Sequence, residues 1–252
     1  MKTLYDEVFN NVDLNKIAII DENNKYTYKK LKNDCDIVYL LFKQKYGLKK
    51  KICICLPNCY LNVVLFLVSA KLQYKIFPIN TKISKNNFIN YSNKFKFNIY
   101  ILDNIDLIKT IHNKNINNHL STKNIYKILD NNNISVKNNN YSSKKISTNR
   151  YLIILSSGST GDPKPIILSQ RNKYLRSKFA GETYRFTKNE VIILPYQLDH
   201  SVGQRLMFMS LFHNGTLVLT KNFEPKVWYK LCIKHSVTFS ILVSFHIKNI
   251  LQ

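Results

Sequence analysis

The sequence predicts an α/β protein in which layered, mainly parallel sheets are flanked by helices. Two patterns along the 252 residues lead to this prediction. Short runs of Ile, Leu and Val recur along the chain, and their length and β-branched content are typical of buried strands. Helix-length segments separate several of these runs, and such an alternation of strand and helix is typical of parallel sheets covered by helices.

Each expected element follows from a local pattern. Strands are expected where a few apolar residues follow one another between polar or turn-forming residues, and helices where apolar residues recur at helical spacing. The expected strands are Ile17–Ile20, Ile52–Leu56, Ile76–Pro78, Ile99–Leu102, Leu152–Leu155, Val191–Leu194, Thr216–Leu219 and Phe239–Val243. The expected helices are Tyr28–Tyr46, Leu61–Leu72, Arg171–Ala180 and Lys226–Lys234.

Composition divides the chain into three parts. Residues 1–103 form an N-terminal α/β part, and residues 150–252 form a second α/β part that holds a loop rich in Gly and Ser. Between them, residues 104–149 are dense in Asn, Lys and Ser and show little apolar periodicity after Ile128. Because such a composition buries little apolar surface, an irregular connection is expected there.

The run Ser-Ser-Gly-Ser-Thr-Gly-Asp-Pro-Lys, residues 156–164, directly follows the expected strand Leu152–Leu155. Its glycines permit positive φ angles and a close backbone approach, so that successive N–H groups can turn toward one ligand. Its hydroxyl groups add short donors, and its lysine adds a positive charge. The candidates for phosphate contact are Ser156, Ser157, Gly158, Ser159, Thr160, Gly161 and Lys164. The pattern predicts a loop that holds a polyphosphate.

This loop differs from the common P-loop, in which a lysine directly follows the second glycine. Asp162 and Pro163 intervene before Lys164 in this chain. Pro165 then stands where the helix of a P-loop would begin. Composition alone is equally typical of a plain linker rich in Gly and Ser, so the order of the residues decides between the two interpretations.

That order resembles the phosphate-binding signature of the adenylate-forming enzymes, which include acyl-CoA synthetases, luciferases and the adenylation domains of peptide synthetases. Other segments resemble motifs of this family in the same order, namely Tyr26–Leu31, Lys51–Asn58, Phe77–Asn80, Leu168–Asn172, Asn214–Leu219 and Phe223–Pro225. The resemblance covers nearly the whole chain. Two positions depart from the family's pattern, since Pro165 replaces a glycine and Gln170 replaces a histidine.

The resemblance implies the N-terminal portion of such an enzyme, that is, an incomplete large N-terminal domain truncated at its C-terminus. The family's later segments supply adenine contacts, a carboxylate for Mg²⁺ and a lid with a catalytic lysine, and none of them is found in this sequence. A gene fragment and a split enzyme with a separate C-terminal chain are both compatible with this. In either case little activity is expected from the chain alone, because positioned charges supply most of the rate enhancement.

The resemblance also implies a reaction and its participants. An ATP-dependent carboxylate ligase joins an acid to AMP with release of pyrophosphate, and then passes the acyl group to CoA or to the thiol of a carrier protein. The implied cofactors are ATP and Mg²⁺, with the protein ligand of Mg²⁺ expected only in the missing half. The substrate is a small carboxylic acid or an amino acid, and Lys164 and His200 are the expected catalytic residues. A non-catalytic remnant or interaction module that keeps the fold is an alternative.

A second candidate site follows the expected strand Val191–Leu194. His200 and Gly203 resemble a family motif that places a histidine near the acyl pocket, although two extra residues separate His200 from Pro195. An alternative alignment matches Asp199 to the aspartate that pairs with the substrate's α-ammonium group in amino-acid-adenylating members. A surface Asp-His pair that caps the following helix is a third interpretation. We expect His200, Asp199 and Gly203 to bind substrate, and prefer His200 as the pocket residue.

The formal net charge of +23 is of a size found in nucleic-acid-binding proteins. The lysines are spread along the chain, however, and no helix-turn-helix, zinc-finger or RNA-recognition pattern is present. We therefore expect no specific nucleic acid as a partner.

The five cysteines predict neither a metal site nor a disulfide framework. No nearby His or further Cys completes a tetrahedral set around Cys53, Cys55 and Cys59. Cys53 and Cys55 are expected to pack as small hydrophobes on one face of a buried strand. The longest apolar run, Leu61–Ala70, is far shorter than the ~20 residues that a bilayer requires. No membrane span and a reduced, cytoplasmic protein are therefore expected.

Overall fold

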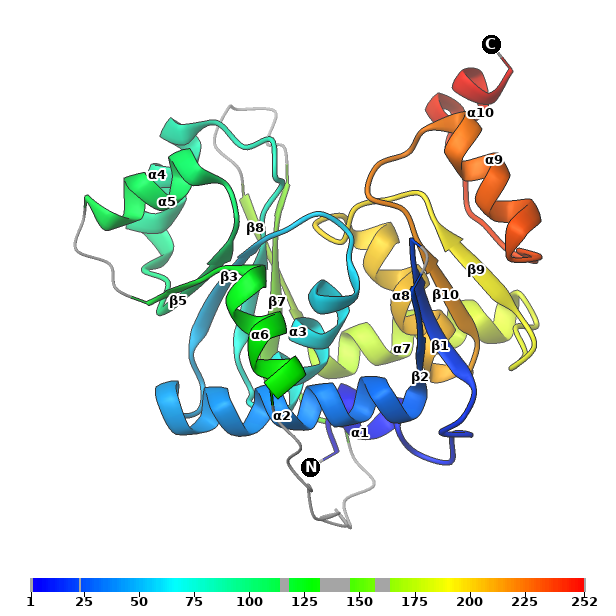
Figure 1. Ribbon diagram of the computed structural model, residues 1–252, viewed down its shortest axis with the longest axis horizontal. Helices are drawn as coiled ribbons and strands as arrows, with labels where there is room; N and C mark the ends of the chain where they lie inside the picture. The colour runs from blue at the N-terminus through cyan, green and yellow to red at the C-terminus, as the bar shows by residue number, and fades with distance from the viewer. Residues whose placement is uncertain (1, 23, 114–117, 132–145, 157–163, 252) are drawn as a thin grey trace.

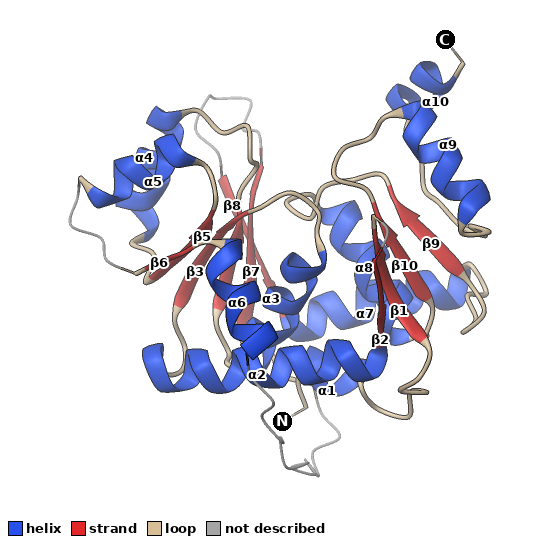
Figure 2. Ribbon diagram, in the orientation of Figure 1, coloured by secondary structure: helices blue, strands red, loops and turns tan. Residues whose placement is uncertain are grey.

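The computed structural model describes residues 2–22, 24–113, 118–131, 146–156 and 164–251 (Figure 1). Two sheets share a layer of helices, and further helices cover the outer faces (Figure 2). The architecture is the layered, mainly parallel α/β arrangement that the sequence predicts.

Within the described residues, the larger sheet has six strands, and all neighbouring pairs are parallel except the last. In spatial order they are β6 (His119–Leu120), β5 (Ile99–Leu102), β3 (Lys51–Cys55), β4 (Lys75–Pro78), β7 (Arg150–Ser156) and β8 (Lys164–Ser169). The edge strand β8 runs antiparallel to β7. Its second residue is Pro165, which an edge strand tolerates because one side of such a strand needs no ladder hydrogen bonds.

The smaller sheet has four strands in the part of the chain that the structure describes. In spatial order they are β2 (Asn24–Thr27), β1 (Ile17–Asp21), β10 (Thr216–Leu219) and β9 (Val191–Leu194). The β1–β10 and β10–β9 pairs are parallel, whereas β2 returns antiparallel to β1. Ile19 pairs with Leu217, so this sheet joins segments from opposite ends of the chain.

Helices lie between the two sheets and on their outer faces. They are α1 (Leu4–Val8), α2 (Tyr28–Tyr46), α3 (Tyr60–Lys71), α4 (Lys85–Phe95), α5 (Ile105–His112), α6 (Thr122–Asn131), α7 (Gln170–Thr183), α8 (Ser201–Phe212), α9 (Pro225–Lys234) and α10 (Ser244–Ile250). We call α3, α7 and α8 the central layer, because α7 contacts β7 and β8, α8 contacts β9 and β10, and α3 contacts both sheets through β4 and β1. Helices α4 and α5 cover the outer face of the larger sheet, and α9 covers that of the smaller one.

The strand β3 shows how the layers form. Ile52 and Ile54 belong to the large core that includes the buried face of α3, whereas Cys53 and Cys55 belong to a separate cluster with residues of α4 and α5. Successive side chains of a strand point to opposite faces, so a continuous apolar strand fills two cores at once. The prediction that Cys53 and Cys55 pack on one face of a buried strand is confirmed.

The structure corrects two predicted elements. Phe239–Val243 forms no strand, and only an isolated bridge joins Phe239 to Ile192. The segment 104–149, predicted to be irregular, contains α5, β6 and α6 in its described residues up to 131. The reason is amphipathic packing, because Leu107 and Ile111 of α5, and likewise Ile125 and Leu129 of α6, recur four residues apart and are buried on one face of their helix.

Both sheets combine strands from residues 1–103 with strands from residues 150–252, through the β1–β10 and β4–β7 pairs. Among the described residues, no helix is both long enough and apolar enough to cross a membrane. The same residues contain no group of three His, Cys, Asp or Glu side chains placed to hold a metal ion.

Candidate functional site

The segments that follow β3, β9 and β10 meet around the side chain of Asn58, which is fully buried. Its Nδ2 donates to the carbonyl oxygens of Tyr196 at 2.7 Å and Thr220 at 3.1 Å, and its Oδ1 accepts from the amide of Leu198 at 2.9 Å. Asn58 follows a strand of the larger sheet, and its amide group forms hydrogen bonds with backbone groups in two loops of the smaller sheet. This is the point at which the two sheets are joined at the carboxyl ends of their strands.

Asp199 lies on the loop that Asn58 holds. Its Oδ2 accepts a hydrogen bond of 3.0 Å from Nδ2 of Asn80, the residue that follows β4 by two positions. Its Oδ1 is buried and has no hydrogen-bond partner among the described residues. Buried polar atoms are nearly always paired, so this oxygen is an acceptor that a ligand can use.

His200 occupies the N-cap position of α8, but its side chain makes no capping hydrogen bond. The side chain is 63% exposed, and its Nε2 lies 3.9 Å from Oδ1 of Asp199. His200 is therefore an exposed ring beside a carboxylate whose side chain is only 13% exposed.

Gly203 lies in the first turn of α8 and faces the backbone of the preceding loop. A Cβ atom at this position would come within 2.4 Å of the carbonyl oxygen of Gln197. Gly203 thus allows α8 to pack closely on the loop that carries Asp199. A substitution of Gly203 would therefore displace the loop that carries Gln197 and Asp199.

The predicted polyphosphate loop, residues 156–164, has paired residues at its two ends. Ser156 ends β7, Lys164 begins β8, and the two are partners in the antiparallel register. Lys164 is exposed. The intervening candidates Ser157, Gly158, Ser159, Thr160 and Gly161 lie outside the described residues.

A polar chain connects the central layer to the Asp199 loop. Lys173 of α7 is 1% exposed, and its Nζ donates to Oε1 of Gln204 at 2.9 Å. Nε2 of Gln204 in turn donates to the carbonyl oxygen of Leu198 at 2.8 Å. Burial lowers the pKa of Lys173 well below its ordinary value, and the charges of Arg176 and Arg205 lower it further.

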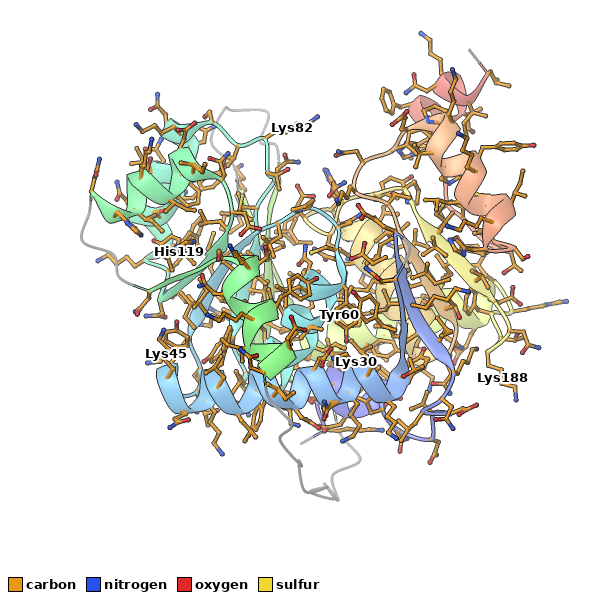
Figure 3. All side chains as sticks on the ribbon, in the orientation of Figure 1. Lys30, Lys45, Tyr60, Lys82, His119 and Lys188 are labelled. Atoms are coloured by element: carbon orange, nitrogen blue, oxygen red, sulfur yellow. The ribbon has the colours of Figure 1, made fainter. Side chains whose placement is uncertain are left out.

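The start of α3 is held by two carboxylates. The amide of Tyr60 donates to Oδ2 of Asp21 at 2.8 Å, and the hydroxyl of Tyr60 donates to Oδ2 of Asp34 at 2.7 Å. Nζ of Lys30 donates to the other oxygen of Asp34 at 2.8 Å. Lys30 and Tyr60 are labelled in Figure 3, which draws the described side chains. Burial raises the pKa of Asp21, which ends β1 on the side where Asn58 joins the sheets.

The family of the chain can now be stated, because a family model described as AMP-binding enzyme matches residues 7–252. The chain belongs to this family. It is 36% identical over 66 residues to the acyl-CoA ligase cnsG of Penicillium expansum, an overlap of 26% of this chain and 14% of that protein. The adenylate-forming resemblance in the sequence is confirmed.

Solved structures of other proteins have the same fold as this chain. ATP-bound MatB from Rhodopseudomonas palustris superposes with a TM-score of 0.85 at 18% identity, over 99% of this chain and 50% of MatB. The inhibitor-bound N-terminal domain of FACL13 from Mycobacterium tuberculosis gives a TM-score of 0.85 at 16% identity, over 100% of this chain and 65% of that one. The chain thus spans about half the length of MatB.

Several residues that the structure brings together are not among the site residues expected from the sequence. Asn58 and Asn80 each follow a predicted strand, and polar residues just beyond parallel strands are a signal that could have singled them out. Lys173 carried no such signal, because its burial depends on Gln204 of another helix.

Proposed function

We propose that this chain is the N-terminal part of an ATP-dependent carboxylate ligase. The reaction joins a carboxylic acid to AMP with release of pyrophosphate, and then transfers the acyl group to CoA or a carrier thiol. The match of the AMP-binding enzyme family to residues 7–252 carries this proposal. The position of Asp199 and His200 beyond the ends of parallel strands supports it, because ligands of open α/β sheets bind there.

In this proposal the loop from Ser156 to Lys164 holds the β- and γ-phosphates of ATP. Its backbone N–H groups and hydroxyls donate to phosphate oxygens, and Lys164 offsets the charge that develops as the acid attacks the α-phosphorus in line. His200 lies beside the acid, where its exposed ring contacts the substrate.

Mg²⁺ accompanies ATP in most phosphoryl and nucleotidyl transfers, usually held by one or two carboxylates together with the phosphates. The described residues contain no set of three ligating side chains for it. The steps proposed here therefore use only the chain's own groups.

We further propose that turnover requires residues beyond this chain, supplied in the same polypeptide or by a separate C-terminal chain. MatB has about twice the length of this chain, and the second half of MatB has no counterpart in the superposition. A chain that binds the phosphates but lacks the remaining positioned charges loses most of the rate enhancement.

A second candidate substrate is an amino acid. Oδ1 of Asp199 is buried and has no hydrogen-bond partner among the described residues, although Nε2 of His200 lies 3.9 Å away, and a carboxylate oxygen accepts well from an ammonium group. The α-ammonium of an amino acid would supply that donor. Pyrophosphate exchange by the whole protein separates the two candidates, because exchange should be supported either by carboxylic acids without an amino group or by amino acids. Exchange with neither substrate class would indicate a non-catalytic remnant.

The Lys164→Ala variant tests the polyphosphate loop. We expect the chain to bind ATP and pyrophosphate weakly, and Lys164→Ala to weaken binding at least about tenfold, because a charged hydrogen bond contributes about 1.5–3 kcal/mol. Isothermal titration calorimetry measures both ligands. Lys226→Ala, which removes an exposed lysine of α9, is the matched control and should bind as wild type. Equal affinities for Lys164→Ala and wild type would show that the loop assignment is wrong.

A further inference from the structure

The outward side of α9 carries a regular stripe of side chains. Its inner side packs on β1, β9 and β10 through Trp228, Leu231 and Cys232. Positions that follow one another by three or four residues share one side of a helix. The opposite side of α9 is exposed at five such positions, which we call the outer stripe: Lys226, Tyr229, Lys230, Ile233 and Lys234. Figure 1 shows α9 at the outside of the smaller sheet.

The apolar members of the outer stripe are largely exposed to water. Tyr229 is 62% exposed, and Ile233, one turn further along the helix, is 63% exposed. Helix α10, which contacts α9, leaves Phe245 65% exposed and Ile247 48% exposed. Single exposed apolar residues are common at protein surfaces, but several on adjoining helices are typical of an interaction surface.

The charged members of the outer stripe all have the same sign. Lys226, Lys230 and Lys234 are spaced by four residues, and like charges at this spacing destabilise a helix. Residues 225–251 contain no Asp or Glu, and the nearest acid before them is Glu224, the N-cap of α9. Among the described residues, the ion pairs involve neither Lys226 nor Lys230. The charge of the outer stripe is therefore complementary to an anionic surface.

The alternation of lysine with a large apolar residue distinguishes between two kinds of anionic partner. A nucleic acid would pair its phosphate groups with the lysines but leave Ile233 in water. A lipid surface offers phosphate groups to the lysines and, directly beneath them, acyl chains to Tyr229 and Ile233. Lysine stems lie along apolar surface while their ammonium groups stay in the headgroup layer. With 10 residues, α9 is too short to span a bilayer, so the contact is with the membrane surface only.

We propose that the outer stripe of α9 binds the surface of an anionic membrane. Its lysines contact the lipid phosphate groups, and Tyr229 and Ile233 enter the boundary between headgroups and acyl chains. Each lysine near such a surface strengthens binding, and salt weakens this contribution by screening. The inner side of α9 stays packed on the smaller sheet, so binding requires no unfolding of the helix. The proposal does not depend on the ligase reaction or on the polyphosphate loop.

Sedimentation with lipid vesicles tests this proposal on the whole protein. Mixed vesicles, made of equal parts phosphatidylglycerol and phosphatidylcholine, should bind it far more tightly than vesicles of phosphatidylcholine alone, and added salt should weaken that binding. Lys226→Gln/Lys230→Gln should reduce the affinity for mixed vesicles at least about tenfold, because two lysine contacts with anionic lipid are lost. Lys123→Gln/Lys127→Gln, with the same charge change and spacing on the exposed side of α6, is the matched control and should bind as wild type.

A second pair of variants tests the apolar contribution. Tyr229→Ser/Ile233→Ser changes two exposed residues, should fold normally by circular dichroism and should bind mixed vesicles at least about tenfold more weakly, because apolar area is no longer buried in the lipid. Ile105→Ser removes a side chain of α5 that is 67% exposed and should bind as wild type. Vesicle binding that is weakened in the glutamine variant but unchanged in the serine variant would indicate a general attraction to polyanions and overturn the membrane proposal.

Three other results would also overturn it. Duplex DNA that displaces the protein from mixed vesicles, with an affinity unchanged in Tyr229→Ser/Ile233→Ser, would assign the outer stripe to nucleic acid. Self-association of wild type in light scattering that the same serine variant abolishes would assign the stripe to a second copy of the chain. No binding of the whole protein to mixed vesicles, or equal binding by wild type and all variants, would show that the stripe does not contact lipid.

Discussion

The helices α3 and α9 are similar in length but differ completely in burial. Eleven of the twelve residues of α3 are buried, from Tyr60 to Ala70, whereas none of the residues of α9 is buried. Both helices are rich in large apolar residues, and α9 leaves Val227, Tyr229 and Ile233 exposed. Hydrophobicity alone therefore does not decide which helix enters the core.

Position relative to the two sheets accounts for this difference. Helix α3 contacts β4 on one side and β1 on the other, so its whole circumference meets protein. Helix α9 covers one face of the smaller sheet, where Trp228 and Leu231 meet only a small cluster of Ile20, Ile193 and Val218. Burial of apolar area is the dominant favourable contribution to folding, so the central layer should govern stability far more than α9 does.

The largest expected effect comes from truncating a side chain of α3. Phe66 is fully buried, and Phe66→Ala should lower the free energy of unfolding by about 3–5 kcal/mol, because it removes apolar contacts and leaves a cavity. Urea denaturation followed by circular dichroism measures the change. Tyr229→Ala in α9 is the control, since Tyr229 is 62% exposed and the expected change is within about 0.5 kcal/mol. Similar losses for both variants would show that the two layers contribute equally.

An intermediate effect is expected at the junction of the sheets. Asn58→Ala removes the partners of three backbone groups at Tyr196, Leu198 and Thr220, and should lower the free energy of unfolding by about 2–3 kcal/mol. The same denaturation measurement applies. Asn87→Ala on the exposed face of α4 should be nearly neutral. A neutral Asn58→Ala would mean that water replaces these bonds at little cost.

A third effect, a pH dependence, is expected in the central layer. The folded-state pKa of Lys173 is lowered, first by burial and then by Arg176 and Arg205, so the unfolded chain binds more protons between the folded and unfolded pKa values. In that window the free energy of unfolding rises with pH, by up to about 1.4 kcal/mol per pH unit. Lys173→Met removes this contribution.

Denaturation of wild type and Lys173→Met at several pH values measures it as a difference. The free energy of unfolding of wild type minus that of Lys173→Met should increase as the pH rises from neutral toward the ordinary pKa of lysine, about 10.4. The buried tyrosines are common to both proteins and cancel. A difference that is constant with pH would show that Lys173 titrates normally in the folded protein.

Local signals in the sequence predicted part of the structure closely. The helix α2 has the predicted bounds, Tyr28–Tyr46, because Thr27 caps its first turn and Gly47, with a φ of 76°, ends it. The strand β8 was not predicted, since Pro165 disfavours a strand everywhere except at an edge, and its edge position depends on β7. The predicted strand Phe239–Val243 has suitable residues but only one bridge to a neighbour.

In the candidate site, too, some residues are predictable from the sequence and others become apparent only from the structure. The polyphosphate loop, Asp199 and His200 are predictions made from residue order alone. The roles of Asn58 and Asn80 depend on hydrogen bonds to Tyr196 and Asp199, across more than a hundred residues of chain. No local pattern contains such contacts.

By itself, the sequence determined the α/β class, most strands, the caps of α2 and membership of the AMP-binding enzyme family. These depend on periodicity, backbone propensity and motifs, which act over a few neighbouring residues. Only the tertiary structure decided that β1 pairs with β10, that Asn58 joins the two sheets and that Lys173 is buried beside two arginines. The physical reason is that burial and hydrogen bonding between distant segments exist only once the sheets and the central layer are assembled.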